Sequence, residues 1–165
     1  MAQVVNTIQI NGPLEPVFDL VTTTRFWTQW HPATVGVGGV TERPLALGDK
    51  IRERANIGGR TYEGNWTAIE HVRPARVALL MESGRIKITY SFQAVGQATE
   101  FKRELEFHPE DFSASAADPD TLQKLMHVQS EQALRKLKAL VETILQKEAA
   151  LEIGLTNVES PISNL

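Results

Sequence analysis

The sequence predicts an α+β fold in which a curved antiparallel sheet of about seven strands wraps around one long C-terminal helix, with two short helices after the first strand. Three observations lead to this prediction. A segment of alternating β-branched residues opens the chain, a series of strand-like segments with short separators follows the short helices, and a long amphipathic stripe comes last. Separators this short connect antiparallel hairpins, because parallel strands need long crossovers.

The first elements follow from periodicity and from proline positions. Residues 4–10, VVNTIQI, alternate with period two and predict a strand. Residues 13–23 have apolar side chains at helical spacing, and Pro16 lies in the first turn, where its missing N–H costs little. A second short helix is predicted from Thr24 to Trp30, ending before Pro32.

The middle of the chain consists of strand-like segments separated by turn-forming pairs such as Gly48-Asp49, Gly58-Gly59 and Ser83-Gly84. Each segment is rich in β-branched and aromatic residues. The predicted strands are 34–43, 48–57, 60–72, 76–83, 85–95 and 98–108.

The last predicted element is a helix that starts with Asp118 as N-cap and Pro119 at the first helical position. Its apolar stripe extends to about Lys147, which is on the order of 45 Å. The chain therefore divides into a domain of residues 1–148 and a tail of residues 149–165 without a clear period. A homodimer is one possible role for the apolar residues of this tail, which are Leu151, Ile153, Leu155 and Val158.

Composition limits the classes of function. The net charge is −3 and the lysines and arginines are spread along the chain, so no basic stripe for nucleic acid is expected. The chain has no cysteine, which excludes disulfides, thiolate nucleophiles and cysteine metal ligands. The first residues, MAQVVNTIQING, do not resemble a signal peptide, and no apolar run is long enough to span a membrane. We therefore expect a soluble cytoplasmic protein.

Three stretches resemble the START-like, or SRPBCC, superfamily, which includes polyketide cyclase/dehydrase-like proteins with the helix-grip fold. They are IQINGPLEPVFDLVTTTRFWTQWHP (8–32), GNWTAIEHVRPARVALL (64–80) and ATEFKRELEF (98–107). The resemblance covers about Val4 to Lys147. It implies an apolar cavity between sheet and helix that binds a lipid, a polyketide or another hydrophobic molecule. Some members of the superfamily are cyclases or dehydratases, and many only bind or carry their ligand.

The aromatic segment 25–39, RFWTQWHPATVGVGG, can be interpreted in two ways. Trp27 and Trp30 are three residues apart and share one helical face. Core packing is the favoured interpretation for Trp30 and Phe26. A place on the wall of a ligand cavity stays open for Trp27 and His31.

Two charged side chains are predicted to point into the hollow of the sheet. Clean alternation directs one face of segment 98–108 inward, namely Phe101, Arg103, Leu105 and Phe107. Glu53 lies on the more apolar face of segment 48–57. A buried guanidinium needs a partner. Arg103 and Glu53 are therefore either polar anchors for a ligand or a structural ion pair. A third possibility is that Arg103 extends its charged end to the rim of the curved sheet, where it meets solvent. A β-bulge between Arg52 and Ile57 would turn Glu53 outward.

The expected ligand site combines apolar walls with a few polar groups. Glu53, Arg103 and Tyr90 are the candidate anchors and also the candidate catalytic residues. The expected walls are Trp27, Trp66, Met81, Ile88, Tyr90, Phe92, Phe101, Leu105, Leu122, Leu125, Met126 and Gln129.

Motifs for other chemistries are not found in the sequence. The four histidines show no metal-ligand spacing, and no G-x-S-x-G or phosphate-binding loop occurs, so we predict no metal and no other cofactor. His127 is expected to be exposed, and His108 is expected in a loop. The prediction is a protein that binds a small hydrophobic ligand. The alternatives are a polyketide cyclase/dehydratase-type enzyme that uses the same cavity, and a protein-interaction or co-chaperone-like module.

Overall fold

A computed structural model describes residues 1–31, 33–57, 59–115 and 118–163, and side chains are described except at 113–115 and 155–163. The predicted order of elements is confirmed. The elements are β1 (Ala2–Ile10), α1 (Leu14–Val21), η1 (Thr24–Phe26), α2 (Trp27–Trp30), β2 (Thr34–Gly39), β3 (Lys50–Ile57), β4 (Arg60–Val72), β5 (Arg76–Met81), β6 (Lys87–Val95), β7 (Ala98–Phe107), η2 (Pro109–Ser115) and α3 (Pro119–Ser163).

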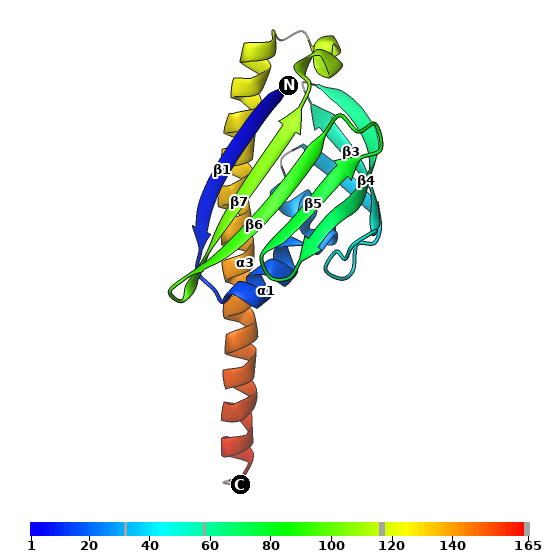
Figure 1. Ribbon diagram of the computed structural model, residues 1–165. Coiled ribbons are helices and arrows are strands. Elements are labelled where there is room, and N and C mark those ends of the chain that lie inside the picture. Colours follow the sequence, from blue (N-terminus) through cyan, green and yellow to red (C-terminus); the bar gives the residue numbers. More distant parts are fainter. Residues whose placement is uncertain (32, 58, 116–117, 164–165) are drawn as a thin grey trace.

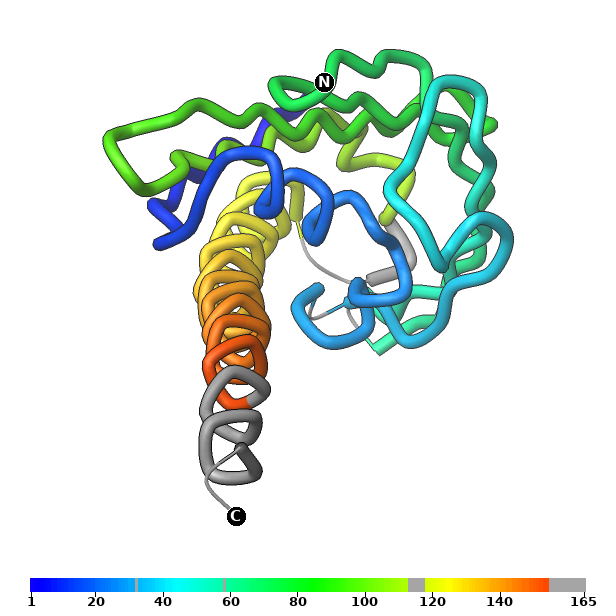
Figure 2. The backbone as a smooth tube through the Cα atoms, turned by 90° about the horizontal axis from the view of Figure 1, so that it is seen from below, coloured from blue at the N-terminus to red at the C-terminus, as the bar shows by residue number. Residues whose placement is uncertain are grey.

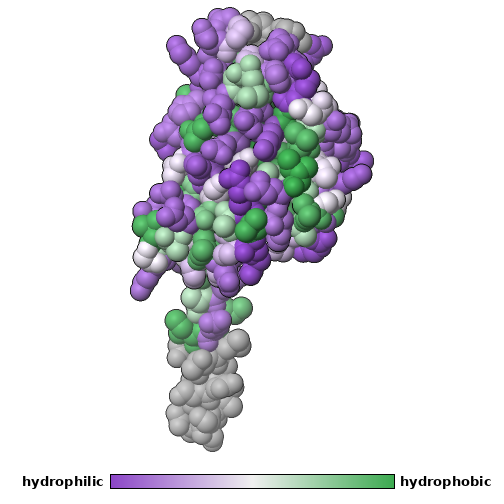
Figure 3. Space-filling view, viewed as in Figure 1, coloured by the Kyte–Doolittle hydropathy of each residue, from purple (hydrophilic) through white to green (hydrophobic). Residues whose placement is uncertain are grey.

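The seven strands form one antiparallel sheet in the order β1-β7-β6-β5-β4-β3-β2. The sheet curves around α3, and α1 and α2 lie beside the helix at one end of the wrap (Figures 1 and 2). The predicted α+β helix-grip architecture is therefore confirmed. The face of the molecule seen in Figure 3 is mainly hydrophilic, with hydrophobic residues distributed between polar ones.

Strand register decides which side chains face the helix. β7 pairs with β6 and β1 without a shift, and Phe101, Arg103 and Phe107 are buried, as alternation predicts. β3 pairs with β4 continuously from Lys50 to Ile57, so no bulge interrupts this pairing. Glu53 therefore faces inward with Ile51, which is buried.

Helix α3 is longer than predicted. Instead of ending near Lys147 it continues to Ser163, because residues 148–153 are mostly good helix formers. The helix leaves the sheet after Leu145. The side chain of Leu145 packs against Gly12, so closely that a Cβ atom at position 12 would lie 2.5 Å from its Cδ1 atom. Figures 1 and 2 show the extension projecting away from the sheet. Leu151 and Ile153 are exposed on it. The side chains of Leu155 and Val158 lie outside the described residues.

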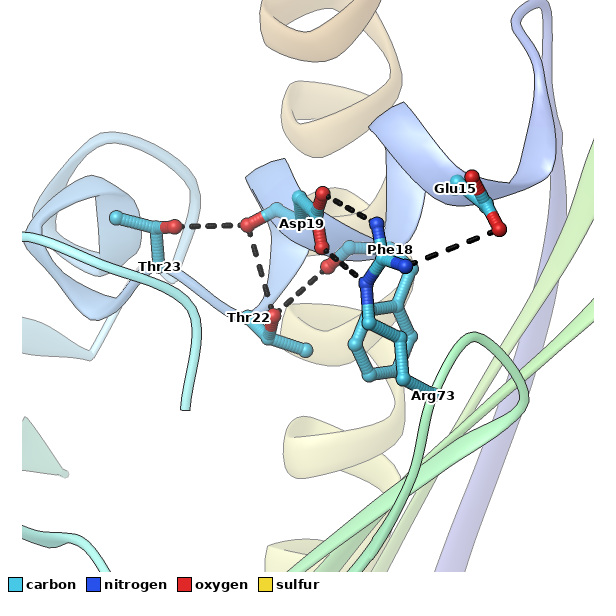
Figure 4. A network of polar contacts seen from close by, with 6 residues as sticks. All are labelled: Glu15, Phe18, Asp19, Thr22, Thr23 and Arg73. Atoms are coloured by element: carbon cyan, nitrogen blue, oxygen red, sulfur yellow. Dashed lines mark hydrogen bonds and ion pairs between the residues drawn. The ribbon is translucent and has the colours of Figure 1, made fainter. Parts of the chain in front are cut away.

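A network of polar contacts attaches α1 to the turn between β4 and β5 (Figure 4). The guanidinium of Arg73 donates two hydrogen bonds to the carboxylate of Asp19, at 3.0 and 2.8 Å, and Glu15 lies 3.7 Å away. The hydroxyls of Thr22 and Thr23 donate to carbonyl oxygens in the last turn of α1. These bonds satisfy groups that a helix end would leave unpaired and hold α1 against the sheet.

Candidate ligand-binding cavity

A cavity of about 420 Å³ lies between the inner face of the sheet and the first turns of α3. Its walls come from the segment between α2 and β2, from β3 to β7, from the β5–β6 turn, from η2 and from α3, and they are mostly apolar. The lining residues are His31, Ala33, Thr34, Glu53, Ala55, Ile57, Tyr62, Glu63, Gly64, Trp66, Met81, Glu82, Ser83, Arg85, Ile86, Ile88, Arg103, Leu105, Phe107, Asp111, Phe112, Met126, Gln129, Ser130 and Ala133.

The structure brings eight of the predicted site residues to this cavity. Six of them form walls and two are the charged candidates. They are Trp66, Met81, Ile88, Leu105, Met126, Gln129, Glu53 and Arg103.

Six other predicted wall residues do not line this cavity. Five of them point inward but are covered by core packing, namely Trp27, Tyr90, Phe92, Phe101 and Leu122. Phe92, for example, packs on Phe18 of α1 with ring centroids 4.9 Å apart, and on Phe101 at 5.1 Å. Leu125 is 41% exposed, because it lies on the outer face of α3 whereas Met126 faces the sheet.

Several lining residues were not predicted. On α3, Ser130 and Ala133 were not predicted; they follow the predicted Met126 and Gln129 at helical spacing and face the cavity with them. Ser130 and Ala133 are small residues in an otherwise bulky stripe, and this is the signal in the sequence that could have identified the hollow. His31, for which the sequence allows either core or cavity, reaches the wall, whereas Trp27 belongs to the core.

Arg103 is the buried cation of the cavity. Its side chain is 7% exposed, and Nη1 donates to the Ser130 hydroxyl at 3.0 Å. Its Nε has no hydrogen-bond partner among the described residues, and no described carboxylate forms an ion pair with it. Burial lowers the pKa of this guanidinium below its ordinary value. The guanidinium therefore has an unused hydrogen-bond donor in a largely apolar environment.

Glu53 is held on the cavity wall by its own neighbours. Its carboxylate accepts a hydrogen bond from Trp66 Nε1 at 3.1 Å and another from the Thr34 hydroxyl. The alternative of a structural ion pair between Glu53 and Arg103 is wrong, since each has different partners. The two charges line one cavity as separate polar groups.

A pair of buried neutral groups lies beside Arg103. The Nε2 atom of His31 and the hydroxyl of Tyr90 are 3.2 Å apart. Burial raises the pKa of Tyr90, although the charge of Arg103 opposes this shift. Burial, followed by the charge of Arg103, lowers the pKa of His31 well below 6.5. Both side chains are therefore uncharged near neutral pH. Tyr90 itself lies in the core, behind the cavity residues His31 and Arg103.

An ion-pair cluster connects the β5–β6 turn with η2 beside the cavity. Arg85 Nε is 2.7 Å from the Asp111 carboxylate, and Nη2 is 3.2 Å from that of Glu110. Phe112 of the same short helix packs edge-on against Tyr62, with ring centroids 5.5 Å apart. These contacts hold η2 over one side of the cavity.

Comparison with known families identifies the protein type. The model of the family described as polyketide cyclase/dehydrase and lipid transport matches residues 1–142. The chain belongs to this family. This membership and the observed sheet and helix agree with the START-like resemblance of the sequence. Comparison with curated proteins gives no match.

Solved structures share the fold of this polyketide cyclase/dehydrase family member. Protein TTHA0849 from Thermus thermophilus is 18% identical, with a TM-score of 0.70 over 87% of this chain and 99% of that one. A START superfamily protein from Mycobacterium smegmatis is 16% identical, with a TM-score of 0.68 over 86% and 98% of the two chains. The Aha1 dimer from Colwellia psychrerythraea is 17% identical, with a TM-score of 0.61 over 86% and 97%.

Membership and geometry together characterise a START-like domain of the ligand-binding type. The described residues contain no group of three or more side chains suited to hold a metal ion. None of the helices in the described part of the chain is both long and apolar enough to cross a membrane.

The buried His31 of this family member predicts a pH dependence of stability. Its pKa in the folded state lies below 6.5, so the unfolded state binds the proton more tightly. The free energy of unfolding should therefore be highest above pH 6.5 and fall as the pH is lowered, by at most about 1.4 kcal/mol per pH unit, until the folded-state pKa is passed. Urea denaturation between pH 4.5 and 8 measures this slope.

Two variants assign the slope to one histidine. His31→Gln should flatten the curve between pH 4.5 and 6.5. His127→Gln is the control, because His127 is exposed as predicted. An unchanged slope in His31→Gln would contradict the burial argument.

Proposed function

We propose that the protein binds a small hydrophobic molecule, such as a lipid, a polyketide or an aromatic compound, with an oxygen-bearing end directed at Arg103. The observation that carries this proposal is the largely apolar cavity that encloses a buried guanidinium with an unused donor. An unpaired buried charge is costly, and a ligand oxygen that accepts from Arg103 would offset that cost.

The walls and the polar groups would have different roles in binding. Burial of apolar ligand surface against residues such as Trp66, Ile88 and Met126 would contribute about 25 cal/mol per Å² to the affinity. Arg103 would donate to a carbonyl, hydroxyl or carboxylate oxygen, and the Glu53 carboxylate would accept from a ligand hydroxyl. The apolar surface thus provides affinity, and the separated charges orient the ligand.

Native mass spectrometry of the freshly purified protein tests this proposal. We expect a stoichiometric adduct that is released on denaturation and can be identified. Titration with the fluorescent probe 1-anilinonaphthalene-8-sulfonate, which combines apolar rings with an anionic oxygen group, gives a second measurement. A clean mass together with no binding of this probe or of a panel of lipids and aromatic polyketides would contradict the proposal.

Filling the cavity should weaken binding without unfolding the protein. Ala133 is buried on the inner face of α3 and lines the cavity, so Ala133→Phe places a ring where the ligand would lie. We expect at least about a tenfold loss of probe affinity, because a ligand that overlaps the new ring loses its burial.

The matched control for this variant is Ala139→Phe, since Ala139 is exposed on the outer face of the same helix. It should bind the probe as the wild type does. Equal affinities of both variants for the probe would place the binding site outside the cavity.

A cyclase/dehydratase-type reaction is the second candidate function, and the separation of Glu53 from Arg103 favours it. Arg103 could polarise a ligand carbonyl while Glu53 accepts a proton from the adjacent carbon, so that this carbon adds to a second carbonyl of a poly-ketone chain and Glu53 returns the proton to the oxygen formed there. The resulting β-hydroxyl would then leave as water, with Glu53 taking a second proton from the same carbon and delivering it to the departing oxygen. Loss of turnover in Glu53→Gln with retained ligand binding would separate this function from binding alone. A role only in protein interaction fits less well, since it predicts a filled cavity.

A further inference from the structure

The free edge of β2 offers unpaired backbone groups. β2 is the last strand of the sheet and pairs only with β3 in the described part of the chain. The N–H of Val40 donates to the carbonyl of Lys50 at 3.2 Å. Along an antiparallel pair, residues whose backbone groups bond to the partner strand alternate with residues whose backbone groups point away from it. Val37 and Gly39 therefore direct their N–H and C=O groups away from β3. Such an edge can accept another extended chain.

A row of cations lies beside this edge on the outer face of the sheet. Lys50, Arg52 and Arg54 alternate along β3 and are all exposed. Arg54 forms an exposed ion pair with Glu63 at 3.1 Å. Lys50 and Arg52 form no side-chain hydrogen bond or ion pair with any described residue. This local positive charge contrasts with the net charge of −3 of the whole chain.

A glycine in β2 lets the side chain of Arg52 reach the edge. Gly36 is paired with Arg54, and Gly38 is paired with Arg52. A Cβ atom at Gly38 would lie 3.2 Å from Arg52 Nη2, so the guanidinium lies across β2 in the space that a side chain would occupy. A hollow of about 230 Å³ remains there, lined by Gly36, Val37, Arg52, Arg54 and Glu63.

We propose that the β2 edge binds an extended peptide segment with acidic side chains, which adds an eighth strand to the sheet. The backbone of Val37 and Gly39 would form hydrogen bonds with the added strand, which would lie about 4.8 Å from β2. Its outward-facing carboxylates would meet Arg52, whose guanidinium lies over Gly38, and Arg54, which lines the same hollow. Backbone pairing provides the affinity, and the cations select acidic residues.

A second copy of this chain fits the same edge less well. Pairing of two β2 strands would bring the cations of both copies to the same outer face, where like charges repel one another. A segment of another protein with acidic residues at alternate positions has the complementary charge. The ligand cavity lies on the other face of the sheet, and of the residues that line the hollow only Glu63 also lines the cavity.

The test uses the full chain labelled with ¹⁵N and a capped peptide of alternating glutamate and valine, with a lysine–valine peptide for comparison. At low ionic strength the acidic peptide should shift the amide resonances of Val37 and Gly39 and protect them from exchange. Arg52→Ala should weaken its binding about tenfold, and 0.5 M salt should weaken wild-type binding strongly. Arg135→Ala removes the same charge from the outer face of α3 and should have no effect.

Three results would overturn the proposal. One is that the amides of Val37 and Gly39 stay unchanged at saturating acidic peptide. Another is a lack of selectivity: the acidic and the lysine–valine peptides bind the wild type equally, or the Arg52→Ala and Arg135→Ala variants bind the acidic peptide with the same affinity. The third is that the two amides shift with protein concentration in the absence of peptide, which would assign the edge to a second copy of the chain.

Discussion

Replacing Arg103 by methionine is expected to weaken binding of 1-anilinonaphthalene-8-sulfonate by roughly 10- to 100-fold and to leave the protein folded. A hydrogen bond to a charged group contributes about 1.5–3 kcal/mol, which corresponds to this loss of affinity. The guanidinium is buried without a carboxylate partner among the described residues, so a methionine of similar length removes an unpaired charge from the core. The free energy of unfolding should therefore stay unchanged or rise by about 1–4 kcal/mol.

Lys102→Met is the matched control. Lys102 precedes Arg103 on β7 but belongs to the opposite face of the sheet, where it pairs with Glu104 at 3.4 Å. This variant should bind the probe as the wild type does. Probe titration and urea denaturation of both variants separate the two effects. A stable Arg103→Met protein with wild-type affinity would show that the guanidinium does not contact the ligand.

Replacing Trp30 by alanine should cause the largest loss of stability. Trp30 is completely buried and packs on His31, with ring centroids 4.0 Å apart, and edge-on against Phe101 at 6.4 Å. Truncation of a buried tryptophan costs about 3–5 kcal/mol. For a chain of this size the melting temperature should fall by roughly 10–15 °C, as measured by calorimetry or circular dichroism.

Two further variants make this prediction specific. The Nε1 of Trp30 has no hydrogen-bond partner among the described residues, so Trp30→Phe loses volume but also removes an unsatisfied donor. It should cost clearly less than Trp30→Ala. Val35→Ala is the surface control, because Val35 is 56% exposed, and should change the melting temperature little. A small effect of Trp30→Ala would contradict the assignment of this aromatic segment to the core.

Local periodicity was sufficient to predict the type and order of the elements, but not all of their ends. Alternation along β7 predicts the inward face that contains Arg103, and the side-chain period of two makes this prediction independent of distant residues. The apolar stripe of α3 predicts a helix under the sheet, but its end was misplaced. The sequence beyond Lys147 does not continue the apolar stripe, and the helical structure there follows local propensity instead.

The position of the cavity could not be predicted in the same way. Ile88 and Tyr90 are two residues apart on the same face of β6, yet Ile88 lines the cavity and Tyr90 is covered next to His31. The difference arises because α2, which is distant in sequence, packs over one end of the sheet. On α3, the neighbouring residues Leu125 and Met126 point in different directions around the helix. Met126 therefore lies on the cavity wall, whereas Leu125 is exposed to solvent.

The sequence by itself determined which residues form strands and helices, which strand faces point inward and which superfamily the chain resembles. These properties depend on neighbours along the chain. Only the tertiary structure decided that Arg103 and Glu53 are separate, with Arg103 bonded to Ser130 and Glu53 to Trp66 and Thr34. The tertiary structure also decided which inward-facing residues are covered by core packing and which of them line the cavity. These outcomes depend on the curvature of the sheet and on packing between distant segments, which no local pattern encodes.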